Sequence, residues 1–449
     1  MTRILYWNIQ QFGINKINNP SLKRQRGASV NGQQASIDRR NYIMSTFATH
    51  VPDIIVVVEV QTGGGAQGTL ITNSGGSQGV RSLLGFIQGA LGATWSVVPP
   101  LILGGANNTE GVAVFYDSAN LNFTGPFVWT GGPSIAAGAP GIGPLVNYPA
   151  PWNTALPAGN APAGGNTINP GVAYRQLAGQ WLFEDNAVPP NIIGFPGANN
   201  RPPFLTSFWD PTNNRTIKLL SFHASPNPGP AANGTNSLAN IREMTTNLGA
   251  NEVGVIVGDF NVNLFNTFYE PIAYTRLLTP APGGAAYTRA INPTANTFPQ
   301  KGFVCTHIKL SNQAKPWYTN GYPGYGYVGS NPQYPGYDSI DNVLTRYGGG
   351  GGPAANITIV NRITGTPYTQ VAPPAGPPGT YVYPTAMDAF PVGHPQAGLP
   401  SALPLPPLGP TGNGGIAPGT IGGLSKFKGW NNYGKIRSTS DHLPLIIDV

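Results

Sequence analysis

Acidic, amide and histidine side chains follow several apolar runs of this sequence. In the most informative case the run Val253–Val257 is followed by Gly258-Asp259-Phe260-Asn261, which offers a carboxylate and a carboxamide two residues apart. Because alternate residues of a strand point to one side, Asp259 and Asn261 are expected to share a side of the strand's end. Such a pair suits the binding of one water molecule or one metal-bound oxygen, although an Asx turn is an equally good interpretation of these four residues.

Four other segments place polar residues at the ends of apolar runs. They contain Asn8 after Tyr6-Trp7, Glu59 in Asp53–Val60, His223 after Leu219–Phe222, and Asp441-His442 before Leu443–Val449. A single glutamate at a strand end is usually a boundary residue, and a single histidine there is usually structural. Ligands of α/β proteins collect at strand ends, however, so the whole set predicts one active site.

The apolar runs and the segments between them predict an α/β protein. Continuous Ile, Val and Leu runs are typical of strands that are covered on both faces, and amphipathic segments between them are typical of helices. The expected strands are Ile4–Ile9, Asp53–Val60, Gly111–Tyr116, Thr216–His223, Val253–Asp259, Ser339–Thr345 and Leu443–Val449. The expected helices are Ile37–Thr49, Val80–Leu91 and Ser237–Leu248.

Two Gly/Pro-rich blocks interrupt this alternation. No charged residue occurs between Asp117 and Arg175, and a similar composition returns from Gly348 to about Gly423. Because neither block has the helices and long apolar runs of a second core, we expect surface insertions at about 118–175 and 348–423 in a single catalytic domain, 1–449. The blocks could form short strands or a lid. A further loop, Trp317–Tyr327, is rich in Tyr and Gly and could stack bases or sugars, but a self-packed loop is the simpler interpretation.

Composition narrows the class of protein. The chain has 449 residues, 61 of them Gly and 47 Pro, and 9% are charged, against about 25% in an ordinary globular domain. Its net charge of +7 favours a polyanionic partner. The single cysteine, Cys305, allows no intrachain disulfide. We expect no transmembrane segment, because no apolar run approaches the roughly 18 residues that cross a bilayer. We also expect no signal peptide, because the first expected strand follows Met1-Thr2-Arg3 directly. Localisation stays open, although low charge with abundant Asn, Gly, Thr and Pro is typical of exported proteins.

The order of the motifs resembles the endonuclease/exonuclease/phosphatase superfamily, whose fold is that of deoxyribonuclease I. The resemblance spans Tyr6 to Asp448, outside the two insertions. It is carried by Trp7-Asn8-Ile9, Val57-Val58-Glu59-Val60, Gly258-Asp259-Phe260-Asn261 and Ser440-Asp441-His442-Leu443-Pro444. A histidine in Phe222-His223-Ala224-Ser225 is typical of the nuclease branch. The resemblance implies a four-layer α/β sandwich of two stacked mixed β-sheets flanked by helices, with the site at one end.

The resemblance also implies a role for each matching residue. Glu59 would be the main ligand of Mg²⁺, or of Mn²⁺ or Ca²⁺, with Asn8 and Asp441 beside it. Asp259 and Asn261 would hold the attacking water and a phosphate oxygen. The histidines His223 and His442 would flank the scissile phosphate, one aiding proton transfer and one stabilising charge. Glu110 would support the first histidine and Asp341 the second, with Asp338 as an alternative to Asp341.

The chemistry of these residue types is consistent with those roles. A phosphodiester is an anion, and a hard cation held by carboxylate oxygens neutralises it before attack. A histidine exchanges protons near neutral pH, and a carboxylate behind it sets its tautomer. The absence of cysteine from the set argues against structural zinc, and the sequence has no Gly-x-x-x-x-Gly-Lys-Ser/Thr motif for nucleotide hydrolysis.

The substrate is predicted from weaker signals. Six basic residues lie between Asn8 and Glu59, namely Lys16, Lys23, Arg24, Arg26, Arg39 and Arg40. Such residues contact phosphates without regard to sequence, although a solvated basic loop is the plain alternative. Arg201-Pro202-Pro203 also resembles a segment of extracellular nucleases in which the arginine faces the substrate backbone. We therefore expect Arg201, Arg39 and Arg40 to bind substrate.

Three functions remain open at this stage. The first is a metal-dependent endonuclease that cuts DNA with little sequence preference and needs no obligatory protein partner. The second is a phosphoinositide or sphingomyelin phosphodiesterase of the same superfamily, against which the sequence shows no amphipathic membrane-docking helix. The third is a binding protein without activity, which is disfavoured because binding alone does not require this set of acids, amides and histidines.

Overall fold

A computed structural model describes the parts of the chain that build two β-sheets and their helices. It describes residues 1–24, 30–65, 67–104, 109–125, 152, 175–177, 180–183, 185–189, 191, 193, 195, 201–245, 248–280, 286–292, 306–307, 339–350, 352, 356–360, 368–369 and 438–449. Asp338, Arg26, Cys305 and the Tyr/Gly loop 317–327 lie outside these residues, as does most of both expected insertions.

The first sheet is formed by both ends of the chain. Its strand order is β15-β14-β16-β1-β2-β5-β3, with β4 also paired to β5. Strands β1 and β2 run parallel, and the other neighbours are antiparallel. The strands are β1 (Arg3–Phe12), β2 (Ile54–Val60), β3 (Trp95–Val98), β4 (Ile102–Leu103), β5 (Glu110–Asp117), β14 (Asn356–Ile359), β15 (Tyr368–Thr369) and β16 (Leu445–Asp448).

The second sheet is formed by the middle of the chain and is also mixed. Its strand order is β12-β13-β11-β10-β9-β6, and its parallel pair is β10 with β11. The strands are β6 (Asn122–Gly125), β9 (Phe204–Asp210), β10 (Arg215–His223), β11 (Glu252–Asp259), β12 (Thr288–Arg289) and β13 (Asp341–Tyr347). A separate hairpin joins β7 (Arg175–Leu177) to β8 (Gln180–Leu182).

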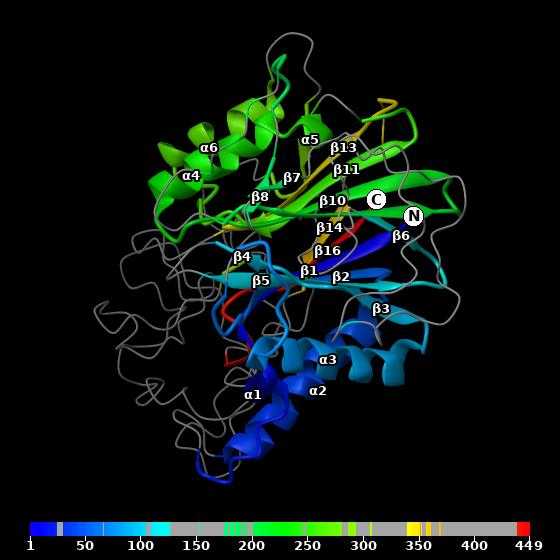
Figure 1. Cartoon of the computed structure of the whole chain (residues 1–449), viewed down its shortest axis with the longest axis vertical. Helices are drawn as coiled ribbons and strands as arrows, with labels where there is room; N and C mark the ends of the chain where they lie inside the picture. The colour runs from blue at the N-terminus through cyan, green and yellow to red at the C-terminus, as the bar shows by residue number, and fades with distance from the viewer. Residues whose placement is uncertain are drawn as a thin grey trace, which may run out of the picture.

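The helices cover the outer faces of the sheets. Figure 1 shows α1 (Ile14–Ile17), α2 (Gly32–His50) and α3 (Gly75–Leu91) below the first sheet, and α4 (Pro228–Ser237) and α6 (Tyr269–Leu278) beyond the second. The central strands are buried almost completely, because apolar side chains cover both of their faces. Four layers result: helices, sheet, sheet and helices. Within the described residues, no helix combines the length and apolarity that crossing a bilayer requires.

The fold expected from the sequence is confirmed: two mixed sheets stack between helices. One helix was predicted in the wrong place. Instead of Ser237–Leu248, the chain forms α4, then a 3₁₀ turn at Leu238–Asn240 and the short α5 (Arg242–Thr245). Pro228, at the start of α4, favours an earlier beginning. Ile241 then adopts an extended conformation that breaks the helix, and its side chain is buried.

Parts of both expected insertions belong to the sheets. Strand β6 lies within 118–175 and forms the edge of the second sheet. Strand β14 lies within 348–423, pairs with β16, and buries Ile357 completely. Composition concealed both strands, because each is only four residues long in its Gly/Pro-rich surroundings. The strand β9 and the helix α6 were not predicted either.

Candidate active site

The sheet register brings three of the predicted residues side by side at one edge of the second sheet. His223 is the last residue of β10 and pairs with Asp259, the last residue of β11. Asp259 in turn pairs with Asp341, the first residue of β13. Because β10 and β11 are parallel, their carboxyl ends meet at the same edge. All three side chains are buried.

The first sheet brings its polar residues to the same place. Asn8 and Glu59 lie near the carboxyl ends of the parallel strands β1 and β2, and both strands have irregular register there. Glu59 has a φ of 60°, which is rare for a residue other than glycine. Backbone strain of this kind is common at functional sites. Asp441 and His442 precede β16, and the Ser440 hydroxyl hydrogen-bonds the carbonyl oxygen of Asn8.

His223 has a carboxylate behind its ring. Its Nδ1 lies 2.7 and 2.9 Å from the two oxygens of Glu110, the first residue of β5. Arg201 Nη1 lies 2.7 Å from Glu110 Oε2, so the carboxylate is held from both sides. Burial alone would raise the pKa of Glu110, but His223 and Arg201 outweigh it and lower that pKa. The first expected histidine–carboxylate pair is therefore present in the structure.

His442 has an equivalent arrangement. Its Nδ1 lies 2.8 Å from Asp341 Oδ2, and the other Asp341 oxygen accepts a hydrogen bond of 3.2 Å from the Tyr6 hydroxyl. Asp341 therefore makes the expected contact with His442, while the alternative Asp338 lies outside the described residues. The indole nitrogen of Trp7 donates to the backbone oxygen of His442 at 2.9 Å, which fixes the histidine from the first sheet.

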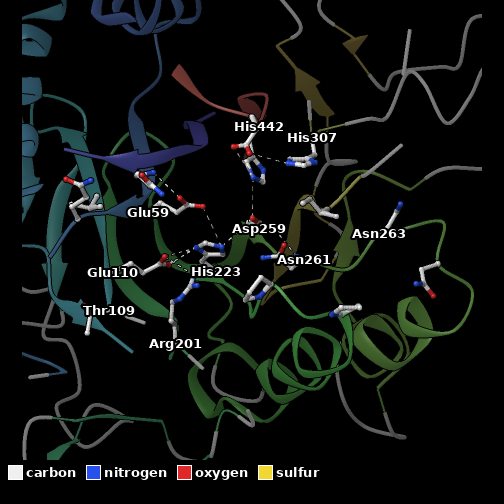
Figure 2. A pocket seen from close by; sticks show the side chains of 18 of the residues that line it. Glu59, Thr109, Glu110, Arg201, His223, Asp259, Asn261, Asn263, His307 and His442 are labelled. Carbon is white, nitrogen blue, oxygen red and sulfur yellow. Dashed lines mark hydrogen bonds and ion pairs between the residues drawn. The ribbon is translucent and has the colours of Figure 1, made fainter. Parts of the chain in front are cut away.

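Both histidines direct their remaining ring nitrogen toward one oxygen. Asp259 Oδ2 lies 3.5 Å from His223 Nε2 and 3.6 Å from His442 Nε2, and Asn8 Nδ2 donates to it at 3.2 Å. Figure 2 shows the two rings on either side of Asp259. Two histidines from different sheets, each supported by its own carboxylate, thus converge on a buried aspartate.

The electrostatics of this centre favour protonated histidines. Burial would lower the pKa of His442, but Asp341, Asp259 and Asp441 outweigh it and raise that pKa to about 10. Burial would also lower the pKa of His223, but the negative charge of Glu110 has the larger opposing effect, and this pKa is raised. Burial raises the pKa of Asp259. The carboxylates therefore favour the protonated form of both rings, which face the space in front of Asp259.

The donor set beside Glu59 fits a hard cation. Asn8 Oδ1 is buried and has no hydrogen-bond partner among the described residues, and oxygen atoms of this kind are ligands for Mg²⁺ or Ca²⁺. Glu59 Oε1 accepts from Asn8 Nδ2 at 3.0 Å, and Oε2 accepts from the Gln11 backbone at 3.0 Å. Asp441 Oδ2 accepts from Gln10 at 3.1 Å. Two carboxylates and an amide therefore lie along the end of β1.

Asn261 combines the two interpretations that the sequence left open. Its backbone N–H donates to Asp259 Oδ1 at 2.9 Å, which is an Asx turn, and its φ is 50°. The strand has already ended at Asp259, so the expectation of a shared side by strand alternation is wrong. Both side chains nevertheless line the same pocket, because the turn and not the strand directs Asn261 there.

An open pocket of about 870 Å³ lies in front of these residues. Eight of the predicted site residues line it, namely Glu59, Glu110, Arg201, His223, Asp259, Asn261, Asp441 and His442. His307 also lines it. Asn8 and Asp341 lie behind this wall and are completely buried. Arg201 is thus near the substrate space, although the atoms described above pair it with Glu110.

The structure does not bring Arg39 and Arg40 to the pocket. Arg39 is buried on α2, where its Nε donates to the Ser438 hydroxyl at 3.2 Å, and burial lowers its pKa to about 10. Arg40 stacks over the Phe86 ring of α3 at 4.5 Å. Lys16, from the same basic segment, donates to the backbone oxygens of Ser438 and Thr439.

A histidine that lines the pocket, His307, was not predicted from the sequence. His307 follows the apolar run Phe303–Cys305, as the predicted site residues follow theirs, but that run was not recognised as a strand end. Its ring centre lies 4.8 Å from that of His442. The pattern of an apolar run followed by a histidine was therefore available in the sequence.

Two mixed sheets, with paired histidines and carboxylates at the edge where both parallel strand pairs end, decide the fold. This is the fold that the resemblance to the endonuclease/exonuclease/phosphatase superfamily implied. No family model matches the sequence, and no curated protein is detectably similar to it.

Several solved structures are similar to this chain at low identity. Humanized TDP2 of D. rerio has 8% identity and a TM-score of 0.40, with 100% of this chain and 99% of that chain covered. Mannosyl-6-phosphatase of Bacteroides thetaiotaomicron has 9% identity and a TM-score of 0.37, covering 100% and 99%. Beta toxin of Staphylococcus aureus has 10% identity and a TM-score of 0.38, covering 82% and 95%.

Proposed function

We propose that this chain is an enzyme of the superfamily whose fold it has: a divalent-metal-dependent phosphodiesterase that cuts DNA within the strand with little sequence preference. The observation that carries the proposal is the convergence of His223 and His442 on Asp259. Each histidine has a buried carboxylate at Nδ1, and each directs Nε2 toward the same oxygen from a different sheet. A structural role would not require two such pairs to face an open pocket.

A phosphodiester suits the charge of this pocket. Neighbouring carboxylates raise the pKa of His223 and raise that of His442 to about 10, so they favour the cationic form of both rings. Two N–H donors on either side of one point can bind the non-bridging oxygens of a phosphate, or stabilise the charge that grows during attack. A neutral or cationic substrate would gain nothing from this arrangement.

The residues at the end of β1 would hold the cation. Glu59, Asn8 and Asp441 supply the oxygen atoms, as their contacts above indicate. A divalent cation bound there would neutralise the phosphate and stabilise charge on the departing oxygen. Cation binding requires ionised carboxylates, so affinity is expected to fall in acid.

The remaining steps belong to side chains of this chain. Asp259 Oδ2 accepts a hydrogen bond from water and orients it for attack on phosphorus, and Asn261 restrains that aspartate through its backbone N–H. The P–O bond to the leaving group breaks as the water oxygen bonds to phosphorus. One imidazolium donates its proton to the leaving oxygen, and Asp259 accepts the proton of the water. The second imidazolium stays charged beside the phosphate. Glu110 and Asp341 keep both rings in the donating orientation.

The support for DNA comes from the chain's own charge and from Arg201. The net charge is +7, and Arg201 lines the pocket beside His223. A basic protein gains sequence-independent affinity from contacts with the phosphate backbone. Because Arg39 and Arg40 contact other parts of the protein, they now contribute less to this argument than the sequence suggested.

Nicking of supercoiled plasmid DNA tests the proposal. Wild-type protein is expected to nick it with Mg²⁺ or Mn²⁺ and to stop in EDTA. Glu59→Gln and His442→Ala should each lower the rate by about 10²- to 10⁴-fold, because cation binding and proton transfer are lost. His50→Ala, which changes a histidine at the end of α2 away from the pocket, is the control and should leave the rate unchanged.

The same assay separates the alternatives. Undiminished nicking by both site variants would refute the assignment of the site. Turnover of phosphoinositide or sphingomyelin vesicles without nicking of DNA would show that the substrate is a lipid phosphodiester. Parallel reactions on RNA test the preference for DNA.

A further inference from the structure

His307 is held at the edge of the pocket by backbone contacts. It forms an isolated antiparallel bridge with His442, and the backbone N–H of Leu443 donates to the oxygen of Thr306 at 2.8 Å. The Thr306 hydroxyl accepts hydrogen bonds from the backbone N–H groups of Ile340 and Asp341, at 3.1 and 3.0 Å. The position of this histidine is therefore tied to both residues of the His442–Asp341 pair.

The ring of His307 faces Asp441. Its Nε2 lies 3.5 Å from Asp441 Oδ2, and its side chain is 20% exposed. The opposite oxygen of the same carboxylate, Oδ1, lies 3.8 Å from His442 Nε2. Figure 2 shows His307 beside His442 at the pocket wall. A carboxylate thus lies between two imidazole nitrogens, and all three groups line the pocket.

The ligand atoms of these three side chains are close enough together to surround one metal ion. One ligand atom from each of His307, Asp441 and His442 can be chosen so that all lie within 4.8 Å of one another. Donor atoms bound to the same metal at about 2.1 Å lie roughly 3 to 3.5 Å apart, so only small side-chain movements are needed. His442 Nδ1 contacts Asp341 and its Nε2 faces Asp259, so within this cluster the metal ion would be held by His307 and Asp441.

Imidazole nitrogen changes which metals the site prefers. Mg²⁺ binds oxygen ligands and keeps several waters, so an added nitrogen does little for it. Co²⁺, Ni²⁺ and Zn²⁺ accept imidazole readily and bind mixed nitrogen and oxygen donors more tightly than Mg²⁺ does. A histidine beside a metal-binding carboxylate is therefore a determinant of metal choice.

We propose that His307 is a metal ligand of this site, acting with Asp441, and that it makes the site select a transition-metal ion over Mg²⁺. The inference deepens the proposed function and rests on it for the assignment of Asp441 to the cation. It differs from that assignment in its donor set, because the groups described above for the cation supply oxygen only. Asp441 becomes the residue that joins the oxygen ligands to the nitrogen ligand.

Metal titration of the whole chain tests the inference without any need for activity. Protein stripped with EDTA and dialysed is titrated calorimetrically with CoCl₂ and, separately, with MgCl₂. His307→Asn should raise the Kd for Co²⁺ by at least about tenfold, since loss of groups around a metal costs about that much or more. The Kd for Mg²⁺ should change less than about threefold. Visible absorption of bound Co²⁺ should also change, because its ligand set changes.

His50→Asn is the matched control and should alter neither Kd. His307→Gln repeats the test with a longer amide, and circular dichroism of each variant checks that it has folded. Wild-type protein that does not bind Co²⁺, an unchanged Co²⁺ Kd, or equal weakening of Co²⁺ and Mg²⁺ would each overturn the inference. A Co²⁺ preference that depends on His307, in a protein that nicks no DNA, would retain the metal site and refute the proposed nuclease activity alone.

Discussion

Glu110 has two buried partners, His223 and Arg201, and so determines the state of one histidine. Its carboxylate raises the pKa of His223 against the effect of burial. Glu110→Gln keeps the size but removes the charge, so His223 should lose its proton more readily and Arg201 should lose its ion pair. We expect kcat for DNA cleavage to fall by about 10²- to 10⁴-fold, with a smaller change in KM, in steady-state nicking assays.

A second glutamate provides the control for this change. Glu252 pairs with Lys218 at 2.7 Å at the far end of β11, away from the pocket. Glu252→Gln should leave kcat unchanged, because this ion pair lies at the opposite end of the strand from His223 and Asp259. Equal losses in the two variants would mean that Glu110 acts on stability and not on the histidine.

At the scale of the elements, Gly258 allows β10 and β11 to approach each other just before the site. A Cβ atom at this position would overlap the backbone oxygen of Phe222, the residue before His223. Gly258→Ala should therefore separate the strands, lower stability by about 1–3 kcal/mol and lower kcat by displacing His223 from Asp259. Urea unfolding and single-turnover cleavage measure the two effects.

The helix α3 offers a glycine that should respond in the opposite direction. A Cβ atom at Gly85 meets no atom within 4 Å. Gly85→Ala should stabilise the protein by about 0.5–1 kcal/mol without changing activity, because glycine costs helices conformational entropy. If Gly258→Ala, like Gly85→Ala, lowered neither stability nor kcat, the close approach of β10 and β11 would not be the reason for a glycine at position 258.

The helix α2 connects to the loop before β16 through Arg39. If the arginine positions that loop through Ser438, Arg39→Met should lower kcat by about 3- to 10-fold while DNA affinity and its salt dependence stay unchanged. If it binds substrate instead, affinity should weaken and the salt dependence should become shallower. Arg40→Met, whose side chain stacks on Phe86, is the comparison. Fluorescence anisotropy with labelled DNA at several salt concentrations distinguishes the two outcomes.

At the scale of the whole molecule, Asp210 joins the two sheets. It lies on β9, accepts a 2.5 Å hydrogen bond from the hydroxyl of Thr2 next to β1, and is also bonded by Asn213. Burial would raise its pKa, but these bonds and Arg215 outweigh it, and the pKa is lowered from 3.8. A carboxyl group whose pKa is lower in the folded than in the unfolded state stabilises the folded state at pH values above the unfolded-state pKa. This stabilisation is lost as the pH falls through the folded-state pKa.

Asp210→Asn should therefore reduce stability at neutral pH by about 1–2 kcal/mol. Below pH 3.8 the difference from wild type should shrink, because the wild-type aspartate becomes protonated there too. Denaturant unfolding at several pH values checks both points. A difference that stays constant across the acid range would show that charge on Asp210 is not the cause.

The sequence predicted most of the site because the fold delivers it at strand ends. Asn8, Glu59, His223 and Asp259 each follow a continuous apolar run, and such runs are visible without any structure. The pairing of His442 with Asp341 could be named only from the family resemblance, since 101 residues separate the two positions. His307 was missed because its apolar run is short. The helix expected at Ser237–Leu248 was wrong because the chain is extended at Ile241, whose side chain is buried, and this packing is not visible in the local pattern.

By itself, the sequence determined which residue types end the strands and that strands alternate with helices, whereas the two stacked sheets were implied only by the family resemblance. Those properties are local, since alternation, apolar runs and turn residues act over a few positions. Only the tertiary structure decided that His223 and His442 share one oxygen of Asp259. It also decided that Arg39 faces Ser438 and that His307 faces Asp441. These are contacts between distant segments, and they depend on strand register and sheet stacking, which no short stretch of sequence specifies.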